Sequence, residues 1–298
     1  MGPAVPVQMK IPMDLKPYDI AVNEDDDSAE VNLYGEVVTN IPTDWWGDRI
    51  EGLYIVLADF LNDMETLKNK SSVTFHINSP GGEVFAGISI YNRMKEFTGK
   101  VVTVVDGLAA SAASIIAQGA TPGNRFVCNG TLTMIHGPAS FMFGYYNSNE
   151  MRDSIKQLDA IDKSIAEIYA ATTGQTAEQT RTWMKATTWM SAQDAIDKGF
   201  ADAIKEDGQS ANMVLNSAKS VLNVNGVPMA VRGWQLPDFI PIAKEIPKQK
   251  VTTGTEPDVI KNNKNLDSVS TFNSTNDKNY LDLSNELLEE INKLRDEG

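Results

Sequence analysis

The sequence predicts a mixed α/β domain followed by a polar tail, and two observations carry this prediction. Between residues 28 and 207, short β-branched stretches alternate with segments whose apolar residues recur at helical spacing. The part after residue 207 contains stretches rich in Asn, Ser, Thr and Lys, such as Lys261 to Asn279, with few large apolar groups. Alternating strands and helices are typical of helices packed on a largely parallel sheet. A tail of this composition buries too little apolar surface to offset its ordering entropy, so we expect it to be largely disordered.

Five stretches have the composition of short strands that are buried on at least one face. They are rich in Val, Ile and Thr, and most are bounded by turn residues. In chain order they are Glu30 to Val38, Val73 to Asn78, Val101 to Val105, Arg125 to Cys128 and Thr131 to Ile135.

Four further stretches have the periodicity or composition of helices. They are Asp48 to Leu67, Val84 to Phe97, the small-residue segment Ala109 to Gln118, and Ser148 to Ala171. In the last, Ile155, Leu158, Ile161, Ile165 and Ile168 fall on one face.

Three parts are expected along the chain: an irregular arm over residues 1–27, the α/β domain over 28–207, and a polar linker over 208–298. The arm ends in an acidic run, Glu24 to Asp27, which is typical of a solvated segment. Near the end of the linker, Leu283, Leu287, Ile291 and Leu294 form a helical stripe. This short amphipathic helix either frays as a terminus or docks on a partner.

Composition excludes several classes of protein. A formal net charge of −14 argues against a nucleic-acid binder, because nothing offsets repulsion from phosphates. One cysteine and two histidines exclude a disulfide framework and a Cys/His zinc site, so we expect no metal and no cofactor. There is no secretory h-region and no apolar run long enough to span a membrane. We therefore expect a cytoplasmic protein without membrane or nucleic-acid partners.

Three short motifs lie at predicted strand ends, where α/β folds place their sites. The segment Asn78 to Gly82 (NSPGG) turns sharply and exposes N–H groups that can hold an oxyanion. Gly107 to Ser114 (GLAASAAS) places Ser111 in the first turns of a helix, where developing negative charge is favoured. Met134 to Pro138 (MIHGP) places His136 at a strand end, where it could accept a proton from a serine.

Each motif also has an ordinary structural explanation. These are a Pro-Gly turn, a serine that packs in a small-residue helix, and a structural histidine. The other histidine, His76, lies inside a predicted strand, and we expect it to be a packed or half-exposed residue.

In chain order, SPGG, GLAAS and MIHGP resemble the ClpP family of self-compartmentalising serine peptidases. Further agreement comes from Ala86 to Tyr91, from Thr173 to Gln175 and from Trp189 to Ala192. The resemblance covers about residues 28–207. With its arm and polar tail, the chain looks most like the ClpP-related head maturation (prohead) proteases of tailed phages.

The resemblance implies a fold and a set of roles. The family fold is crotonase-like, built from repeated ββα units, and its members form rings, in some cases stacked, whose long post-histidine helices interlock. Ser111 would be the nucleophile and His136 the general base. The backbone N–H groups of Gly82 and Ala112 would form the oxyanion hole. The strand leading into Gly81 would pair with an extended substrate.

One position departs from the family pattern. The family places an acidic residue before the Trp-Met-Ser-Ala segment to orient the histidine, and here that position is Thr187. Three states are therefore possible: a slow Ser-His dyad, a triad completed by Asp194 or Asp202, or an inactive descendant.

The resemblance favours a serine endopeptidase that processes capsid or scaffold protein during phage head assembly. An inactive or weakly active ring protein that acts as an assembly scaffold is the main alternative. A crotonase-fold enzyme acting on acyl-CoA thioesters needs oxyanion donors but no Ser-His pair, and a Ser-Lys peptidase would need Lys156 or Lys163 to reach Ser111. No ATP-binding P-loop is present, so energy for unfolding a substrate would come from another chain.

Overall fold

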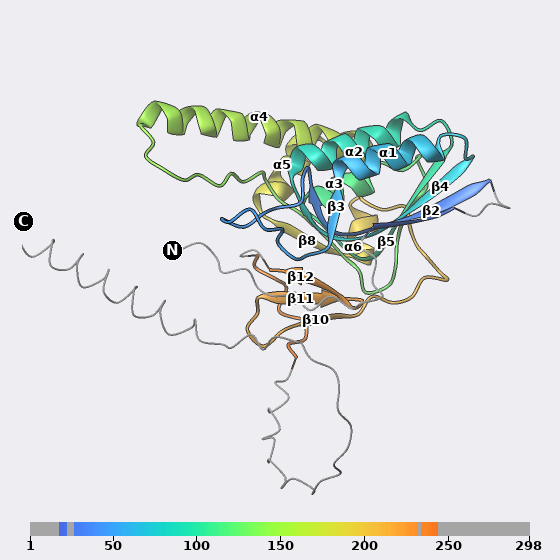
Figure 1. Ribbon diagram of the computed structural model, residues 1–298. Coiled ribbons are helices and arrows are strands. Elements are labelled where there is room, and N and C mark those ends of the chain that lie inside the picture. Colours follow the sequence, from blue (N-terminus) through green and yellow to red (C-terminus); the bar gives the residue numbers. More distant parts are fainter. Residues whose placement is uncertain (1–17, 23–26, 232–233, 244–298) are drawn as a thin grey trace, which may run out of the picture. The chain divides into compact units, whose positions relative to one another are not determined.

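The computed structural model describes residues 18–22, 27–231 and 234–243 (Figure 1). The chain divides into two compact units, Met1–Ile246 and Pro247–Gly298, and every described residue belongs to the first. The amphipathic helix predicted near the C-terminus lies outside the described residues.

The described unit contains six helices and twelve strands. The helices are α1 (Leu57–Leu67), α2 (Val84–Glu96), α3 (Ala112–Ala117), α4 (Ser148–Thr173), α5 (Ala177–Lys185) and α6 (Ala192–Asp197). The first six strands are β1 (Tyr18–Val22), β2 (Ser28–Val38), β3 (Tyr54–Val56), β4 (Ser72–Gly82), β5 (Lys100–Ala110) and β6 (Arg125–Val127). The others are β7 (Leu132–Ile135), β8 (Thr188–Ser191), β9 (Ala203–Ile204), β10 (Met213–Leu215), β11 (Val221–Val224) and β12 (Val227–Ala230). In this part of the chain, no helix has the length and apolar character needed to cross a membrane.

A nine-stranded, largely parallel sheet organises the unit. Its main path runs β1-β2-β4-β5-β6-β9, with β3 paired to β2 and β7 paired to both β5 and β8. The pairs β1–β2 and β7–β8 are antiparallel, and the other pairs of this sheet are parallel. The predicted α/β fold class is confirmed.

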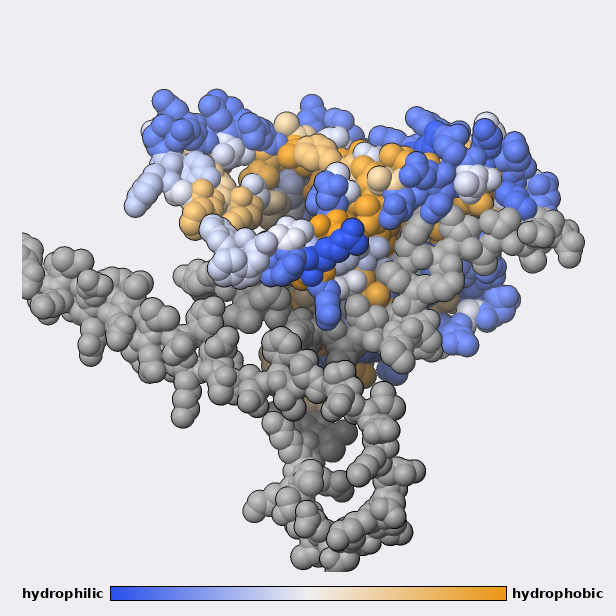
Figure 2. All heavy atoms as spheres, in the orientation of Figure 1, coloured by the Kyte–Doolittle hydropathy of each residue, from blue (hydrophilic) through white to orange (hydrophobic). Residues whose placement is uncertain are grey.

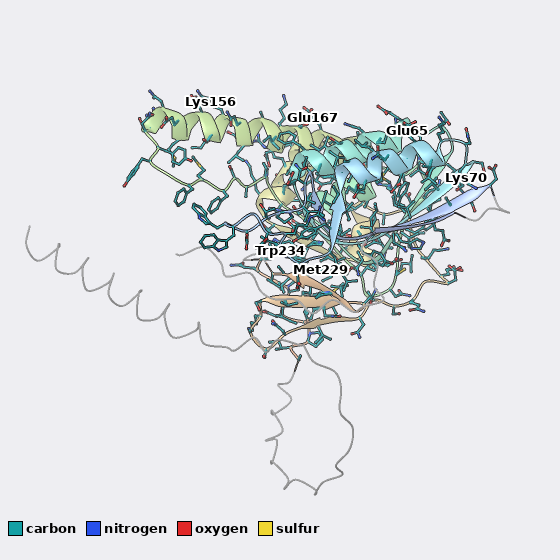
Figure 3. The ribbon with its side chains drawn as sticks, viewed as in Figure 1. Glu65, Lys70, Lys156, Glu167, Met229 and Trp234 are labelled. Carbon is teal, nitrogen blue, oxygen red and sulfur yellow. The ribbon has the colours of Figure 1, made fainter. Side chains whose placement is uncertain are left out.

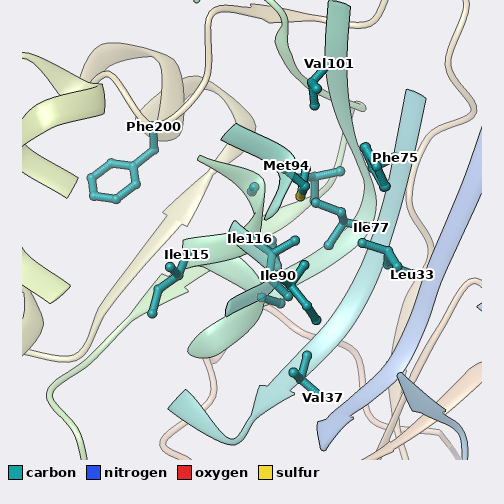
Figure 4. Close-up of a cluster of buried hydrophobic side chains, with 14 of the residues drawn as sticks. Leu33, Val37, Phe75, Ile77, Ile90, Met94, Val101, Ile115, Ile116 and Phe200 are labelled. Atoms are coloured by element: carbon teal, nitrogen blue, oxygen red, sulfur yellow. The ribbon is translucent and has the colours of Figure 1, made fainter. Parts of the chain in front are cut away.

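The two faces of this sheet pack against different layers, because successive side chains of a strand point to opposite faces. In β5, Val105 and Ala109 belong to the core shared with the helices, whereas Leu108 and Ala110 belong to a second core. Figure 4 shows the first core, where strand side chains such as Ile77 lie close to Ile90 of α2 and Ile116 of α3. β5 is thus buried on both faces, as its mostly apolar sequence requires, whereas β2 and the first half of β4 alternate buried with partly exposed residues.

A three-stranded antiparallel sheet, β10-β11-β12, covers the second core. The sequence analysis predicts a polar linker from residue 208, and for these strands that prediction is wrong. Each strand is only three or four residues long, and its buried side chains alternate with more exposed ones. The buried side chains are Met213, Leu215, Leu222, Val224, Val227 and Met229. Their gain in buried apolar surface comes from the large sheet beneath them, which composition alone does not reveal.

Two motif residues fasten the small sheet to the large one. The buried Asn78 donates from Nδ2 to the backbone oxygen of Val224 at 3.0 Å and accepts from the N–H of Leu108 at 3.2 Å. Gly107 has no side chain where Val224 packs, and a Cβ there would collide with the Val224 side chain. Asn78 and Gly107 therefore connect β4 and β5 to a layer that the motifs alone did not predict.

Replacing Gly107 by alanine is expected to lower the free energy of unfolding by about 1–3 kcal/mol, because the added methyl overfills its contacts with the Val224 side chain and the Asn78 side-chain oxygen. Urea unfolding of both proteins measures this difference. The double variant Gly107→Ala/Val224→Ala is the control, since removing the valine methyls relieves the contact with Val224 and should recover part of the loss. If the effects of the two substitutions simply add, the steric explanation is wrong.

Two other predicted boundaries differ from the structure. The helix predicted from Asp48 begins only at Leu57, because Tyr54–Val56 forms β3 and pairs in parallel with the end of β2. Residues 18–22, predicted to be part of an irregular arm, form β1 and pair with β2. In both places a neighbouring strand supplies the hydrogen bonds, which local periodicity does not detect.

Candidate active site

The three motifs of the sequence analysis meet at one edge of the sheet. Gly81 and Gly82 end β4, Ser111 follows β5, and His136 follows β7. These strands are parallel neighbours, in the order β4-β5-β7, so their carboxyl ends lie side by side. Carboxyl ends of parallel strands are the usual location of sites in α/β folds.

Ser111 occupies a strained turn between β5 and α3. Its φ is +54°, a left-handed value that is uncommon for a residue with a side chain. Its backbone N–H donates to the oxygen of Met134 at 2.8 Å, which ties the turn to β7. A Cβ on Gly81 would lie 2.7 Å from the Ala112 nitrogen and 2.8 Å from the Ser111 Cβ, so only glycine fits against this turn.

The side chains of Ser111 and His136 are in direct contact. The distance from His136 Nε2 to Ser111 Oγ is 2.8 Å, within the range for a hydrogen bond. Burial lowers the pKa of His136 below its usual value near 6.5, so the ring is neutral at neutral pH. A neutral imidazole in this position can accept the proton of the serine hydroxyl.

The lowered pKa of His136 predicts the acid limb of any Ser111-dependent activity. The active form carries a neutral imidazole, so activity is lost as pH falls through the His136 pKa and is retained above it. Because burial lowers that pKa, the midpoint of the loss is expected below about 6.5, the ordinary histidine value. The pH profile of kcat/KM measures it, and a midpoint at 7 or above would contradict the desolvation argument.

His136 and Thr187 each lie one residue beyond the antiparallel pairing of β7 and β8. The last pair of that ladder is Ile135 with Thr188. Thr187 is exposed and has a φ of +50°, which is unfavourable for a β-branched residue. Among the described residues, Ser111 is the only hydrogen-bond partner of the His136 ring.

Neither of the two alternative acids reaches His136. Asp194 caps α6 and accepts hydrogen bonds from the N–H and hydroxyl of Ser191, which lower its pKa. Burial opposes ionisation of Asp202, but its hydrogen bonds and ion pair with Arg125 outweigh burial and lower its pKa. The hypothesis of a triad completed by Asp194 or Asp202 is therefore wrong.

The Ser-Lys alternative is also wrong for the two lysines considered. Lys156 pairs with Asp153 at 2.8 Å, and Lys163 lies 3.9 Å from Glu167, both on the exposed surface of α4. Figure 3 shows Lys156 near the outer end of that helix.

A cleft of about 760 Å³ surrounds the Ser-His pair. Its lining includes Gly81, Gly82, Ser111, Ala112 and His136, which are the candidates for the substrate strand, the oxyanion hole, the nucleophile and the base. Thr187 is not part of the lining. The rest of the lining comes from α3, α4, the segment after His136, the start of α2 and Trp234, with two carboxylates, Glu36 and Glu83, among mostly apolar residues.

Gly82 and Ala112 are built so that their backbones line this cleft. The φ of Gly82 is +149°, and a Cβ there would collide with the backbone oxygen of Val37. Ala112 begins α3, so its N–H belongs to the first turn, whose donors have no partner within the helix. The neighbouring Gly81 N–H is already used, because it donates to Ser79 Oγ at 3.1 Å.

Two buried features near the site were missing from the sequence analysis. Ser114 Oγ hydrogen-bonds to the buried hydroxyl of Tyr169 at 2.7 Å and donates to the Ser111 oxygen at 2.5 Å, connecting α4 to the nucleophile turn. Burial raises the pKa of Tyr169 well above its usual value, so the phenol stays protonated. Apolar spacing identified the face of α4 but could not identify the serine that its tyrosine contacts.

The side chain of His76 contacts Asp106, and neither Ser111 nor His136. It is half-buried in β4, as expected, and its Nδ1 lies 3.0 Å from an Asp106 carboxylate oxygen that also accepts from the Tyr34 hydroxyl at 2.7 Å. The hydrogen bond with Asp106 raises the pKa of His76.

Comparison with known proteins agrees with this geometry. Residues 55–208 match the family model described as Clp protease. An ATP-dependent Clp protease proteolytic subunit of Streptococcus agalactiae is 33% identical over 144 residues, covering 48% of this chain and 74% of the relative. The corresponding subunit 1 of Chlamydia abortus is 36% identical over 132 residues, covering 44% of this chain and 69% of the relative. Subunit 1 of Leifsonia xyli is 32% identical over 138 residues, with 46% and 69% covered.

The matched segment contains the three motifs, the strained serine turn and the Ser-His contact, and it spans more than half of the chain. This chain belongs to the Clp protease family.

Proposed function

We propose that the chain is a serine endopeptidase in which Ser111 is the nucleophile and His136 the general base. The observation that carries the proposal is the 2.8 Å contact between His136 Nε2 and Ser111 Oγ inside the cleft. The neutral state of His136 favours this role, since a protonated ring cannot accept the serine proton.

The reaction follows from these positions. His136 takes the hydroxyl proton as Ser111 Oγ forms a bond to the peptide carbonyl carbon, and the carbonyl oxygen becomes an oxyanion held by the N–H groups of Gly82 and Ala112. The C–N bond then breaks, and the leaving amine takes the proton from His136. A water molecule attacks the acyl-enzyme with His136 again as base, which releases the acid and restores Ser111.

An extended peptide suits the edges of this cleft. The end of β4, including Gly81, and the segment after His136 both line the cleft. Main-chain pairing of a peptide to such segments is a form of β-augmentation. This pairing would hold the scissile bond against Ser111 without requiring a particular side chain.

Self-assembly into a ring, or stacked rings, is part of the proposal. The segment after His136 and the start of α4 expose Phe141, Phe143, Met151 and Ile155. Figure 2 shows apolar atoms exposed on this face beside the charged outer surface of α4. Contiguous apolar surface of this kind is typical of contacts between subunits.

We further propose that the substrate is the capsid or scaffold protein of a tailed phage, processed in the host cytoplasm or inside the procapsid. The polar tail, together with the N-terminal arm, supports this assignment, because it is the feature in which the chain resembles the head maturation proteases. Co-expression of the full chain with the head proteins, followed by mass spectrometry of new termini, tests it. New termini that vanish with Ser111→Ala support the proposal, and intact head proteins beside an enzyme that cleaves unfolded casein would refute the assigned substrate.

A weakly active or inactive assembly scaffold is the second candidate, and one observation favours it. Thr187 stands in the sequence where the family pattern has an acidic residue, and a threonine hydroxyl cannot stabilise imidazolium by charge. A scaffold would support head assembly equally well with Ser111→Ala, whereas the peptidase would not.

A further inference from the structure

One wall of the cleft comes from outside the segment that matches the Clp protease family. The match ends at residue 208, whereas Trp234 lines the cleft and follows β12. Figure 3 shows Trp234 beside the small sheet that carries Met229. The layer β10–β12 thus places an aromatic side chain next to the proposed chemistry.

Trp234 packs against a residue of β8, the strand that pairs with β7, and His136 directly follows β7. Its ring meets the Trp189 ring edge-on, with centroids 6.0 Å apart and an angle of 70° between the planes. Trp189 lies in β8 and pairs with Met134 in β7, two residues before His136. Edge-to-face aromatic pairs of this geometry are favourable, so the contact with Trp189 helps to keep the Trp234 ring near the strand that precedes His136.

The small sheet itself is fixed to the active-site strands. Asn78 precedes the Pro-Gly-Gly turn and bonds to Val224, and Asn225 donates from Nδ2 to the Asp106 oxygen at 2.8 Å. Both contacts join β11 or the turn after it to the strands β4 and β5. Trp234 therefore follows a layer that is hydrogen-bonded to β5, the strand that leads into Ser111, and to its neighbour β4.

Part of the cleft that Trp234 lines is apolar. Ile115 of α3 and Leu158, Ile161 and Ile165 of α4 line it, together with the exposed ring of Phe141. Polar lining near Ser111 suits the peptide main chain, and these side chains offer burial to an apolar substrate side chain. Trp234 remains half-exposed, so part of its surface is available to a ligand.

We propose that Trp234 is a specificity-determining residue, which contacts a large apolar side chain of the substrate close to the scissile bond. This inference rests on the proposed peptidase function and names the substrate class of the same site: extended peptides with a large aliphatic or aromatic residue flanking the cleaved bond. The small sheet is then part of the substrate-binding site as well as a cover for the second core.

The test compares wild type with Trp234→Ala on a fluorogenic peptide set. The set varies one residue at a time, from three positions before the scissile bond to three after it, between leucine, phenylalanine and alanine. At one position, Trp234→Ala is expected to lower kcat/KM for the large residues by about 10- to 100-fold, mainly through KM, and to leave alanine peptides unchanged. Trp234→Phe should retain part of the preference.

Two controls separate specificity from folding. Trp45 is 93% exposed and is not part of the cleft lining, so Trp45→Ala should leave all the peptides unchanged. Far-UV circular dichroism and thermal unfolding check that each variant is folded. An equal loss for every peptide, or no change in preference, would overturn the inference.

A binding measurement separates this inference from the proposed catalysis. In the Ser111→Ala background, fluorescence anisotropy gives the Kd of the same peptides with and without Trp234. If wild type cleaves nothing yet binding of large apolar peptides still depends on Trp234, the catalytic proposal fails and the inference about the site stands. If wild type cleaves peptides with no dependence on Trp234, the inference fails and the catalytic proposal stands.

Discussion

Replacing Thr187 by aspartate is expected to raise kcat/KM for peptide hydrolysis by on the order of 10²- to 10⁴-fold. Loss of the acid from other serine-protease triads costs about four orders of magnitude, so supplying one here should recover much of that factor. The carboxylate would accept the free ring N–H of His136 and stabilise the imidazolium that forms in the transition state. Residue 187 and His136 each lie one residue beyond the last pair of the β7–β8 ladder, Ile135 and Thr188, so a side chain at 187 starts close to the base.

The backbone at position 187 accepts this substitution. Its φ of +50° is unfavourable for threonine, whereas Asp and Asn adopt left-handed conformations several-fold more often than other residues. Thr187→Asn is therefore the matched control, since it relieves the same strain and adds no charge. Equal gains in the two variants would show that relief of strain, and not the carboxylate, causes the increase.

The same aspartate should change the pH profile. A carboxylate beside His136 favours the charged ring and raises its pKa, against the lowering that burial causes. The acid limb of kcat/KM in Thr187→Asp is then expected at higher pH than in wild type. An unshifted acid limb would show that residue 187 does not interact with the base.

Replacing Ser111 or His136 by alanine is expected to reduce peptide hydrolysis by on the order of 10²-fold, to the background rate. A full triad contributes about 10⁶-fold and its acid about 10⁴-fold, so a Ser-His pair without the acid retains only the remainder. The two side chains act as a unit through their 2.8 Å contact, so the double variant should be no slower than either single variant. Steady-state rates with a fluorogenic peptide measure the losses. Ser89 lies on α2 and donates its hydroxyl to the Phe85 oxygen, so Ser89→Ala is the control that should keep full activity. Losses that multiply in the double variant would contradict a shared mechanism.

The sequence predicted most of the large sheet and the meeting of the motifs, for physical reasons. Buried strands such as β4 and β5 need apolar residues, which the sequence shows. Parallel strands align their carboxyl ends, so Gly82, Ser111 and His136 are expected at one edge of the sheet. The strained turn at Ser111 and the tight contact with Gly81 explain why small residues surround the serine.

What the sequence did not predict depends on contacts between distant segments. The strands β10–β12 are too short for a clear periodic pattern, and they are stabilised by Leu108 and Ala110 of another sheet. Trp234 follows that layer, which is hydrogen-bonded to Asn78, and lines the cleft as a result of contacts far from it in the sequence. Asp194 and Asp202 could not be excluded as catalytic acids until their partners, Ser191 and Arg125, were visible.

Mass spectrometry after reaction with a fluorophosphonate probe tests the central claim most directly. The probe bonds only to a serine whose hydroxyl is activated, and tryptic peptides identify which serine carries the phosphonyl group. A single adduct on Ser111 that disappears in His136→Ala is the predicted result. A folded, assembled protein with no adduct on Ser111, or with an adduct that persists without His136, would contradict it.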